Sequence, residues 1–248
     1  MPTFRLDVAY DGTAFHGWQV QPGLRTVQGV LEEAVQKVLG EAVRLTGAGR
    51  TDAGCHARGQ VASFTASTSL PATALAPLLR RYLPDDLQVP RAAAVENGFD
   101  ARRSATARRY AYRLLDGRDV LLGRLAWHPR QRLDAERLAA AVRPLEGEHD
   151  CAAFAASGGA PGRTLCRVHR ASWRRWEGGL QLDLVADHFL YHMVRNVVGT
   201  ALLLMDRRAP GEAMAEVVAS RARRRGGPTA PPQGLCLEEV FYPAAVSA

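Results

Sequence analysis

The chain has 248 residues, of which 47% are hydrophobic and 23% are charged, as in ordinary globular proteins. Its most apolar run, from Val194 to Met205, is too short to cross a membrane, which excludes a membrane-spanning protein. The 32 basic residues outnumber the 25 acidic ones and give a net charge of +7, and every basic residue except Lys37 is an arginine. Guanidinium groups bind phosphate and stack on bases, so this balance indicates a nucleic-acid partner, although a GC-rich coding sequence explains it equally well.

The four cysteines, Cys55, Cys151, Cys166 and Cys236, do not follow a spacing typical of metal ligands. The opening residues, MPTFRLDVAY, are typical of a strand and not of a secretory signal. We therefore expect reduced thiols and a cytoplasmic location, and no framework of disulfides.

In the first part of the chain, alternating apolar and polar residues predict a strand over residues 4–10. Thr26 is a good N-cap, and apolar residues at helical spacing then predict a helix that ends at Gly40. The remaining predictions for this part are strands over residues 43–45, 61–65 and 87–95 and a helix over residues 71–82.

In the second part, residues 108–115 alternate as a strand does, which places Tyr110 and Tyr112 on one face. A helix is predicted from Asp134 to just before Pro144. The remaining predictions are strands over residues 168–176, 180–186 and 237–242 and helices over residues 190–205 and 210–220. Strands and helices mixed in this way in both parts indicate an α+β fold with largely antiparallel sheets and helices on the outer face.

The densest cluster of polar residues lies in a Gly-rich connection with the sequence GRTDAGCHA, residues 49–57. It contains Arg50, Asp52 and His56, framed by glycines that let the backbone approach a ligand closely. A carboxylate in such a loop can serve as a nucleophile, a general base or a metal ligand. Taken alone, the pattern fits more often an aspartate that only caps a turn.

The loop is one of an ordered series of segments: YDGTAFHGWQ at residues 10–19, TVQG at 26–29, GRTDAGCHA at 49–57, RRYAY at 108–112, FLYHMVRN at 189–196 and APPQGLCL at 230–237. In order and in register, they resemble the motifs of the tRNA pseudouridine synthase A family, whose signature is G-R-T-D-x-G-V-H-A. The matches span nearly the whole chain. Cys55 stands where the family has Val, a change that should preserve packing but brings oxidation sensitivity if the thiol is exposed.

This resemblance implies an isomerase that converts uridine to pseudouridine at positions 38–40 of the tRNA anticodon stem-loop. The enzyme would be cytoplasmic and homodimeric and would use no cofactor and no metal, because the reaction has no redox step. The resemblance also implies two α/β subdomains with an active-site cleft between them. The N-terminal domain would contain residues 1–105, including the catalytic loop, and the C-terminal domain residues 106–248.

The resemblance also assigns roles to individual residues. Asp52 would be the catalytic residue, whether as a nucleophile or as a base. Tyr110 would lie against the flipped base, with Leu235 on the opposite side of it. Arg195 would pair with Asp52 and keep it ionised. Arg50 would hold the RNA backbone or fill the space that the extruded nucleotide leaves.

The remaining polar candidates receive less specific roles. We expect His56 and His192 to have structural or RNA-contact roles. Two clusters of arginines could bind RNA phosphates or could simply be solvated. They are Arg102, Arg103, Arg108 and Arg109, and then Arg221, Arg223, Arg224 and Arg225.

Two other functions remain open at this point. A non-catalytic RNA-binding module would stack bases on its aromatic strand, but it would have no need for the polar loop around Asp52. A metal-dependent hydrolase or phosphoryl-transfer enzyme would require further acidic ligands. Asp7 and Asp11 are the nearest acids in the sequence, and neither belongs to a metal-binding motif.

Overall fold

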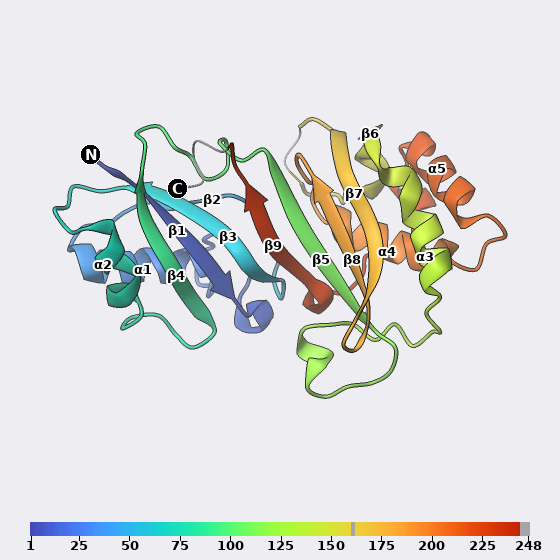
Figure 1. The fold of residues 1–248 in the computed structure, drawn as a ribbon, viewed down its shortest axis with the longest axis horizontal. Coiled ribbons are helices and arrows are strands. Elements are labelled where there is room, and N and C mark those ends of the chain that lie inside the picture. The colour runs from blue at the N-terminus through green and yellow to red at the C-terminus, as the bar shows by residue number, and fades with distance from the viewer. Residues whose placement is uncertain (160–161, 244–248) are drawn as a thin grey trace. The chain divides into compact units, whose positions relative to one another are not determined.

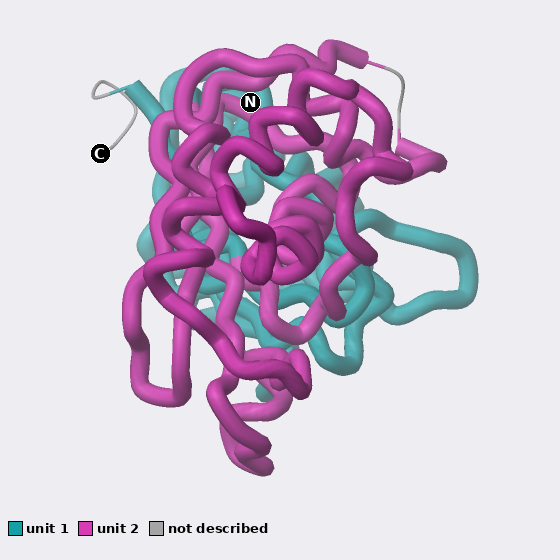
Figure 2. Tube along the Cα trace, turned by 90° about the vertical axis from the view of Figure 1, so that its right-hand side faces the viewer, with its two compact units in different colours: residues 1–106, 237–248 teal, residues 107–236 magenta. Residues whose placement is uncertain are grey.

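The computed structural model describes residues 1–159 and 162–243. The chain forms two compact units, which Figure 2 colours separately. Unit 1 contains Met1–Thr106 and the residues from Leu237 onward, and unit 2 contains Ala107–Cys236. The sequence-based division placed everything after residue 105 in one half. In the structure the last strand is part of unit 1, where the carbonyl of Phe241 accepts a hydrogen bond from the Thr106 N–H (2.8 Å).

Unit 1 combines a sheet with two helices (Figure 1). Its strands follow the order β4 (Leu87–Val95), β1 (Thr3–Tyr10), β3 (His56–Thr65) and β9 (Leu235–Phe241), of which unit 1 contains the part from Leu237 onward. The short β2 (Thr46–Gly47) pairs with β3. β1 is antiparallel to both β3 and β4. Helix α1 (Val27–Leu39) runs behind the strands, and α2 (Ala72–Leu79) contacts both α1 and β4. A short 3-10 helix, η1 (Gly12–Ala14), follows β1.

The predicted helix after Thr26 is confirmed in detail. The Thr26 side chain accepts a hydrogen bond from the Gly29 N–H (3.3 Å), and Gly40 ends the helix at φ 75°, a conformation that favours glycine. The strand predicted over residues 43–45 is wrong. There the Leu45 N–H donates to Glu32 (2.9 Å) and its carbonyl accepts from Gln28 (3.0 Å), so side chains of α1 take the hydrogen bonds that a strand would use.

Unit 2 also combines a sheet with helices. Its strands follow the order β5 (Ala107–Leu115), β8 (Gly179–Ala186), β7 (Leu165–Trp176) and β6 (Gly147–Asp150), and each neighbouring pair is antiparallel. Helices α3 (Ala135–Val142), α4 (Met193–Leu204) and α5 (Pro210–Ser220) pack on one another, with α3 against β7 and α4 against β5 (Figure 1). Its 3-10 helices are η2 (Leu122–Arg124), η3 (Arg143–Leu145), η4 (Cys151–Phe154), η5 (Arg223–Arg225) and η6 (Pro232–Gly234).

Each unit has its own hydrophobic core, and the predicted α+β class with largely antiparallel sheets is confirmed. Among the fully buried side chains are Leu6, Val8, Leu31, Val35 and Leu75 in unit 1, and Tyr112, Leu138, Phe154, Leu182 and Met214 in unit 2. Over the described ranges, 1–159 and 162–243, the helices are all too short or too polar to cross a bilayer.

The N-cap of α1 gives a prediction about stability. Replacing Thr26 with Ala removes the hydroxyl that binds the Gly29 N–H and should lower the free energy of unfolding by about 1 kcal/mol. Thr26→Ser keeps the hydroxyl and should lose much less. Urea unfolding of both variants measures the difference, and equal losses would show that the cap contributes nothing.

Candidate active site

The polar loop of unit 1, residues 49–57, is held in place by the segment that follows β1. The hydroxyls of Tyr10 and Thr51 share a buried hydrogen bond of 2.7 Å. The Trp18 N–H donates to the Thr51 carbonyl (3.0 Å), and the Gly54 N–H donates to the Phe15 carbonyl (3.2 Å). Two segments that the sequence singled out separately, residues 10–19 and 49–57, therefore form one structure around Asp52.

Glycines allow the two segments to approach at backbone distance. A Cβ atom on Gly12 would lie 1.8 Å from the Cys55 carbonyl oxygen, so no other residue fits there without displacing the loop. Gly17 has φ +87°, and a Cβ on it would lie 2.8 Å from the Thr51 carbonyl oxygen. The backbone on either side of Asp52 is thus fixed by contacts that only glycine permits.

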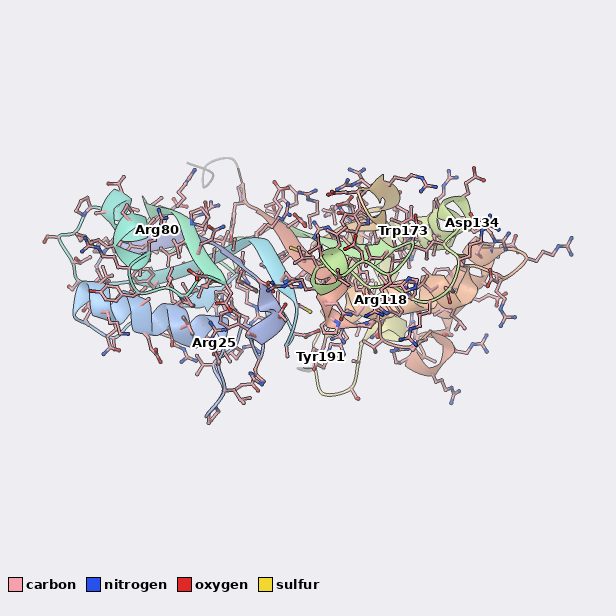
Figure 3. The ribbon with its side chains drawn as sticks, turned by 90° about the horizontal axis from the view of Figure 1, so that it is seen from below. Arg25, Arg80, Arg118, Asp134, Trp173 and Tyr191 are labelled. Atoms are coloured by element: carbon pink, nitrogen blue, oxygen red, sulfur yellow. The ribbon has the colours of Figure 1, made fainter. Side chains whose placement is uncertain are left out.

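An ion pair between Arg25 and Asp86 supports the segment of residues 10–19. Arg25, labelled in Figure 3, donates two hydrogen bonds to the carboxylate of Asp86 (2.9 and 2.8 Å). Its guanidinium lies 3.9 Å from the centre of the Phe15 ring. The Asp86 carbonyl also accepts from the Asp11 N–H (3.0 Å). This ion pair therefore supports the segment that anchors the loop at Asp11 and at Phe15.

The structure gives His56 and Cys55 structural positions. His56 is buried, and its Nδ1 atom accepts a hydrogen bond from the Gly12 N–H (3.0 Å) and lies 3.2 Å from the Asp11 carboxylate. Cys55 is also buried, so its thiol packs as the family's Val would. The exposure on which the expected oxidation sensitivity depended is therefore not present.

Asp52 itself lies at the turn of the loop. Its carbonyl accepts a hydrogen bond from the Cys55 N–H (3.1 Å), and Gly54 closes the turn at φ +77°. The residue is half-buried, so its carboxylate can meet a ligand from solvent while the backbone beneath it stays fixed. This is the arrangement that a catalytic carboxylate needs, because a rigid support keeps the reacting group in position.

A polar cavity of about 240 Å³ adjoins the loop within unit 1. Arg44, Arg50 and Arg102 line it, together with Trp18 and Gln19 among others. The Arg44 side chain is 67% exposed and makes one long ion pair, 3.8 Å, with Glu32. Three guanidinium groups around one cavity suit an anionic ligand. Sequence reasoning missed Arg44, because an isolated arginine next to a helix carries no signal of its own.

In unit 2, β5 and the segment after Thr229 hold two of the expected site residues. Tyr110 is only 7% exposed, and its ring meets the ring of Phe189 edge to face, with 4.8 Å between centroids. The Tyr112 hydroxyl donates to the Pro231 carbonyl (2.7 Å). A Cβ on Gly234 would lie 2.6 Å from the Tyr112 ring, so this close contact fixes the residue just before Leu235, which is buried.

Arg195 lies in the first turn of α4 and is clamped to the same segment. Its Nε atom donates to the Ala230 carbonyl (2.7 Å), and the Ala230 N–H donates back to the Arg195 carbonyl (3.1 Å). The neighbouring Asn196 is fully buried and donates to the Phe154 carbonyl (2.7 Å). Its oxygen accepts from Thr229 (2.7 Å) and Arg223 (2.9 Å). Three of the recognised segments thus meet in unit 2.

The structure separates the expected residues into two groups. Asp52 and Arg50 belong to unit 1, and Tyr110, Arg195 and Leu235 belong to unit 2. The pairing of Arg195 with Asp52 stays a prediction. Sequence reasoning did not single out Asn196 as a functional or supporting residue, although it joins η4, α4 and the segment around Thr229.

Within each of the two arginine clusters, the members differ in burial and in their partners. Arg108 is buried and donates to the Asp187 carbonyl (3.0 Å), and Arg223 donates to Asn196 (2.9 Å), so both have partners within the fold, and their contacts with phosphate stay a prediction. Arg109 lies 3.6 Å from Asp183 and Arg221 lies 3.2 Å from Asp150. The exposed members are Arg102, Arg103, Arg221, Arg224 and Arg225.

The acids considered as metal ligands have other partners. Asp7 accepts a hydrogen bond from Arg5 (2.9 Å) and lies 3.8 Å from Arg91. Asp11 caps η1 by accepting from the Thr13 N–H (3.0 Å). Within the part of the chain that the structure describes, no three His, Cys, Asp or Glu side chains are grouped as metal ligands would be.

A family model described as tRNA pseudouridine synthase matches residues 8–102 and 141–243, which together include every segment described above except residues 108–112. The chain belongs to the tRNA pseudouridine synthase family. Proteins named tRNA pseudouridine synthase A from Moorella thermoacetica and Myxococcus xanthus are 41% and 42% identical over 246 residues. These alignments include 98% of this chain and 100% and 92% of the respective relatives.

A solved structure titled as a Cbf5-Nop10-Gar1 complex is a distant likeness. It aligns with 81% of this chain and 54% of its own chain, at 12% identity and a TM-score of 0.38. The family assignment therefore depends on the sequence relatives.

The close contact at Gly17 can be tested with a matched pair of variants. Gly17 and Gly23 both have a positive φ, but nothing lies within 4 Å of a Cβ on Gly23. Gly17→Ala should therefore lower the free energy of unfolding by about 1–3 kcal/mol more than Gly23→Ala, because only the former pushes on the loop of Asp52. Urea unfolding measures the free energy of unfolding of both variants. Equal losses would show that the backbone at Thr51 can move away from the added Cβ without destabilising the protein.

Proposed function

We propose that this protein converts uridine to pseudouridine at positions 38–40 of the tRNA anticodon stem-loop, with Asp52 as its catalytic carboxylate. Family membership supplies the reaction class, an isomerase acting on uridines of tRNA. The observation that carries the assignment of Asp52 is the anchoring of its loop, whose backbone is fixed by Gly12, Gly17 and Trp18 while Asp52 stays accessible.

The reaction defines what the residues must do. The bond between the ribose and N1 of uracil breaks, the base turns, and a new bond forms between the ribose and C5. C5 loses a proton and N1 gains one, so nothing is oxidised or reduced overall. A carboxylate held beside the ribose can attack the sugar, attack the base or remove a proton, and each of these roles requires the ionised form at a fixed position.

The base needs a binding site once it has left the helical stack, because a stacked uridine hides the atoms that react. We assign this role to Tyr110 and Leu235, which would contact opposite faces of the uracil. Phe189 packs against the Tyr110 ring and so limits its rotation. The close contact of Gly234 with Tyr112 fixes the backbone at Leu235. Both side chains are buried in unit 2, as suits groups that hold an apolar face.

Arg195 would pair with Asp52 and keep it ionised during the reaction. The clamp between Arg195 and Ala230 fixes the guanidinium through its Nε atom, which supports a positioning role of this kind. The cavity lined by Arg44, Arg50 and Arg102 would receive RNA phosphates next to the loop of Asp52. The remaining parts of the proposal, a homodimer and a cytoplasmic location, follow from the resemblance in sequence.

The role of Asp52 predicts a loss of chemistry without a loss of binding. C5 releases its hydrogen during the reaction, so release of tritium from C5-tritiated uridine in an unmodified tRNA transcript measures turnover. Wild-type protein should release tritium in the presence of EDTA, and Asp52→Asn should reduce the rate by roughly 10³-fold or more while still binding the tRNA.

Each other outcome would point elsewhere. Equal release by both proteins would remove Asp52 as the catalyst. No release by either, with tRNA bound, would favour the non-catalytic RNA-binding module. Release that EDTA abolishes would favour a metal-dependent enzyme.

The cavity next to the loop predicts a salt-dependent contribution to binding. In Arg44→Gln/Arg102→Gln, the tRNA affinity should fall, and the slope of log K against log salt should weaken by about 0.9 for each phosphate that the variant no longer neutralises. Arg80→Gln is the matched control, because Arg80 is an exposed arginine of unit 1, labelled in Figure 3, that does not line the cavity. A slope unchanged from wild type in the double variant would show that the cavity does not bind the RNA backbone.

A further inference from the structure

Two of the four cysteines lie together at the β6–β7 end of the sheet in unit 2. β6 and β7 are antiparallel, with His149 opposite Cys166, and Cys151 follows directly after β6. The Thr164 carbonyl accepts hydrogen bonds from both residues, from the Cys151 N–H at 2.8 Å and from the Cys166 thiol at 3.5 Å. Cys151 is the first residue of η4, and the hydrogen bond from its N–H to Thr164 places it beside the strand residues that lead to Cys166.

The two thiols are buried and interact with each other. Cys151 is 2% exposed and Cys166 is 0% exposed, and both are free thiols. The hydrogen bond between them lowers the pKa of Cys151 and raises the pKa of Cys166, with burial adding to the second effect. Each thiol therefore changes the ionisation of the other.

His188 connects Cys166 to the surface. Its Nε2 atom lies 3.3 Å from the Cys166 sulfur and 3.3 Å from the Arg163 carbonyl oxygen. Its Nδ1 atom lies 2.9 Å from the Asp187 carboxylate. A neutral Nε2 can accept the thiol proton, and a protonated Nε2 can donate to the Arg163 carbonyl, so the ring can hold this proton where it arrives.

Asp187 is suited to stabilise the protonated ring. Burial opposes its charge, but hydrogen bonds from the N–H groups of Arg167 (2.9 Å) and His188 (2.8 Å) lower the pKa of the carboxyl below its usual value. An ionised Asp187 then fixes Nδ1 as a donor. The sequence Asp187, His188, Cys166, Cys151 forms a continuous path from a carboxylate to a reactive sulfur, and no step of the proposed uridine reaction uses it.

We propose that Cys151 and Cys166 are a modification site at which a hydroperoxide forms an intramolecular disulfide, with His188 as the proton acceptor. The proposal is independent of the uridine reaction. The His188 side chain is 31% exposed, so it links the buried sulfurs to solvent. The burial of both sulfurs favours a small neutral oxidant over a bulky thiol reagent.

The chemistry balances in two steps. The Cys151 thiol ionises and attacks the peroxide as its thiolate. An S–O bond forms, the O–O bond breaks, and the alkoxide or hydroxide that leaves takes the proton that Cys151 released, becoming an alcohol or water. Cys166 then gives its proton to His188 and attacks the Cys151 sulfur. The S–S bond forms, the S–O bond breaks, and the departing hydroxide takes the proton from His188 to become water. Two thiols are oxidised and one peroxide is reduced.

The test uses the native, full-length protein and hydrogen peroxide. After exposure, the protein is unfolded in an alkylating reagent and its mass is measured, followed by digestion with trypsin under non-reducing conditions. The reduced protein should take up four alkyl groups, one for each of its four cysteines, and the oxidised protein two. Trypsin cuts after Arg163, between the two cysteines, so a disulfide keeps residues 164–167 joined to the peptide that contains Cys151.

Variants assign the reaction to individual groups. Cys151→Ser and Cys166→Ser should each abolish the linked peptide, whereas Cys55→Ser, which removes a buried thiol of unit 1, should leave it unchanged. His188→Gln should slow formation of the disulfide by roughly tenfold or more, because it removes the proton acceptor.

Three results would overturn the proposal or its parts. Retention of all four thiols in native wild-type protein, under peroxide that oxidises the urea-unfolded chain, would show that the pair does not react. Linked peptides that contain Cys55 or Cys236 would place the reaction elsewhere. A wild-type rate in His188→Gln would remove the histidine from the mechanism.

Discussion

The site in unit 1 depends on one constraint, the approach of two backbone segments to a distance that side chains forbid. At Gly12 even a methyl group would lie 1.8 Å from the Cys55 carbonyl oxygen, and at Gly17 it would meet the backbone beside Asp52. Contacts of this kind leave little freedom, because backbone atoms cannot rotate away as a side chain can. The position of the carboxylate is therefore set by the packing of the main chain, and the side chains in between remain available for chemistry or for RNA.

Unit 2 holds its site residues in a different way, through the hydrogen bonds of one buried side chain, Asn196, which we call the polar node. Asn196 binds groups from η4, from η5 and from the segment at Thr229, and Thr200 one turn later accepts from the Gly227 N–H (2.9 Å). The backbone of this segment crosses α4 at Gly199, where a Cβ would lie 1.7 Å from the Pro228 carbonyl oxygen. A buried amide stabilises such a crossing only if its donors and acceptors are all satisfied, so the node specifies one arrangement of the segment.

Local signals predicted the elements whose causes are local. The cap at Thr26, the glycine at Gly40 and the alternation over residues 4–10 each correspond to observed features of α1 and β1. The strand over residues 43–45 failed because distant side chains of α1 take its hydrogen bonds, and β6 was missed because GEHD has no apolar alternation. For the site, the sequence identified the loop of Asp52 but gave no indication of Arg44, of the burial of Arg108 or of the contact between Cys151 and Cys166. Those features arise only when residues far apart in the chain meet.

The place of β9 in the fold has a consequence for how the protein is made. This strand lies beside β3, so closely that a Cβ on Gly59 would meet the Glu238 carbonyl oxygen at 2.3 Å. Unit 2 is continuous in the chain, whereas unit 1 takes most of its last strand from residues that follow unit 2. Domains usually fold as they emerge, with the N-terminal one first. Here the unit that carries Asp52 begins before unit 2 and is completed after it, so a nascent chain has no complete unit 1 until unit 2 has been translated.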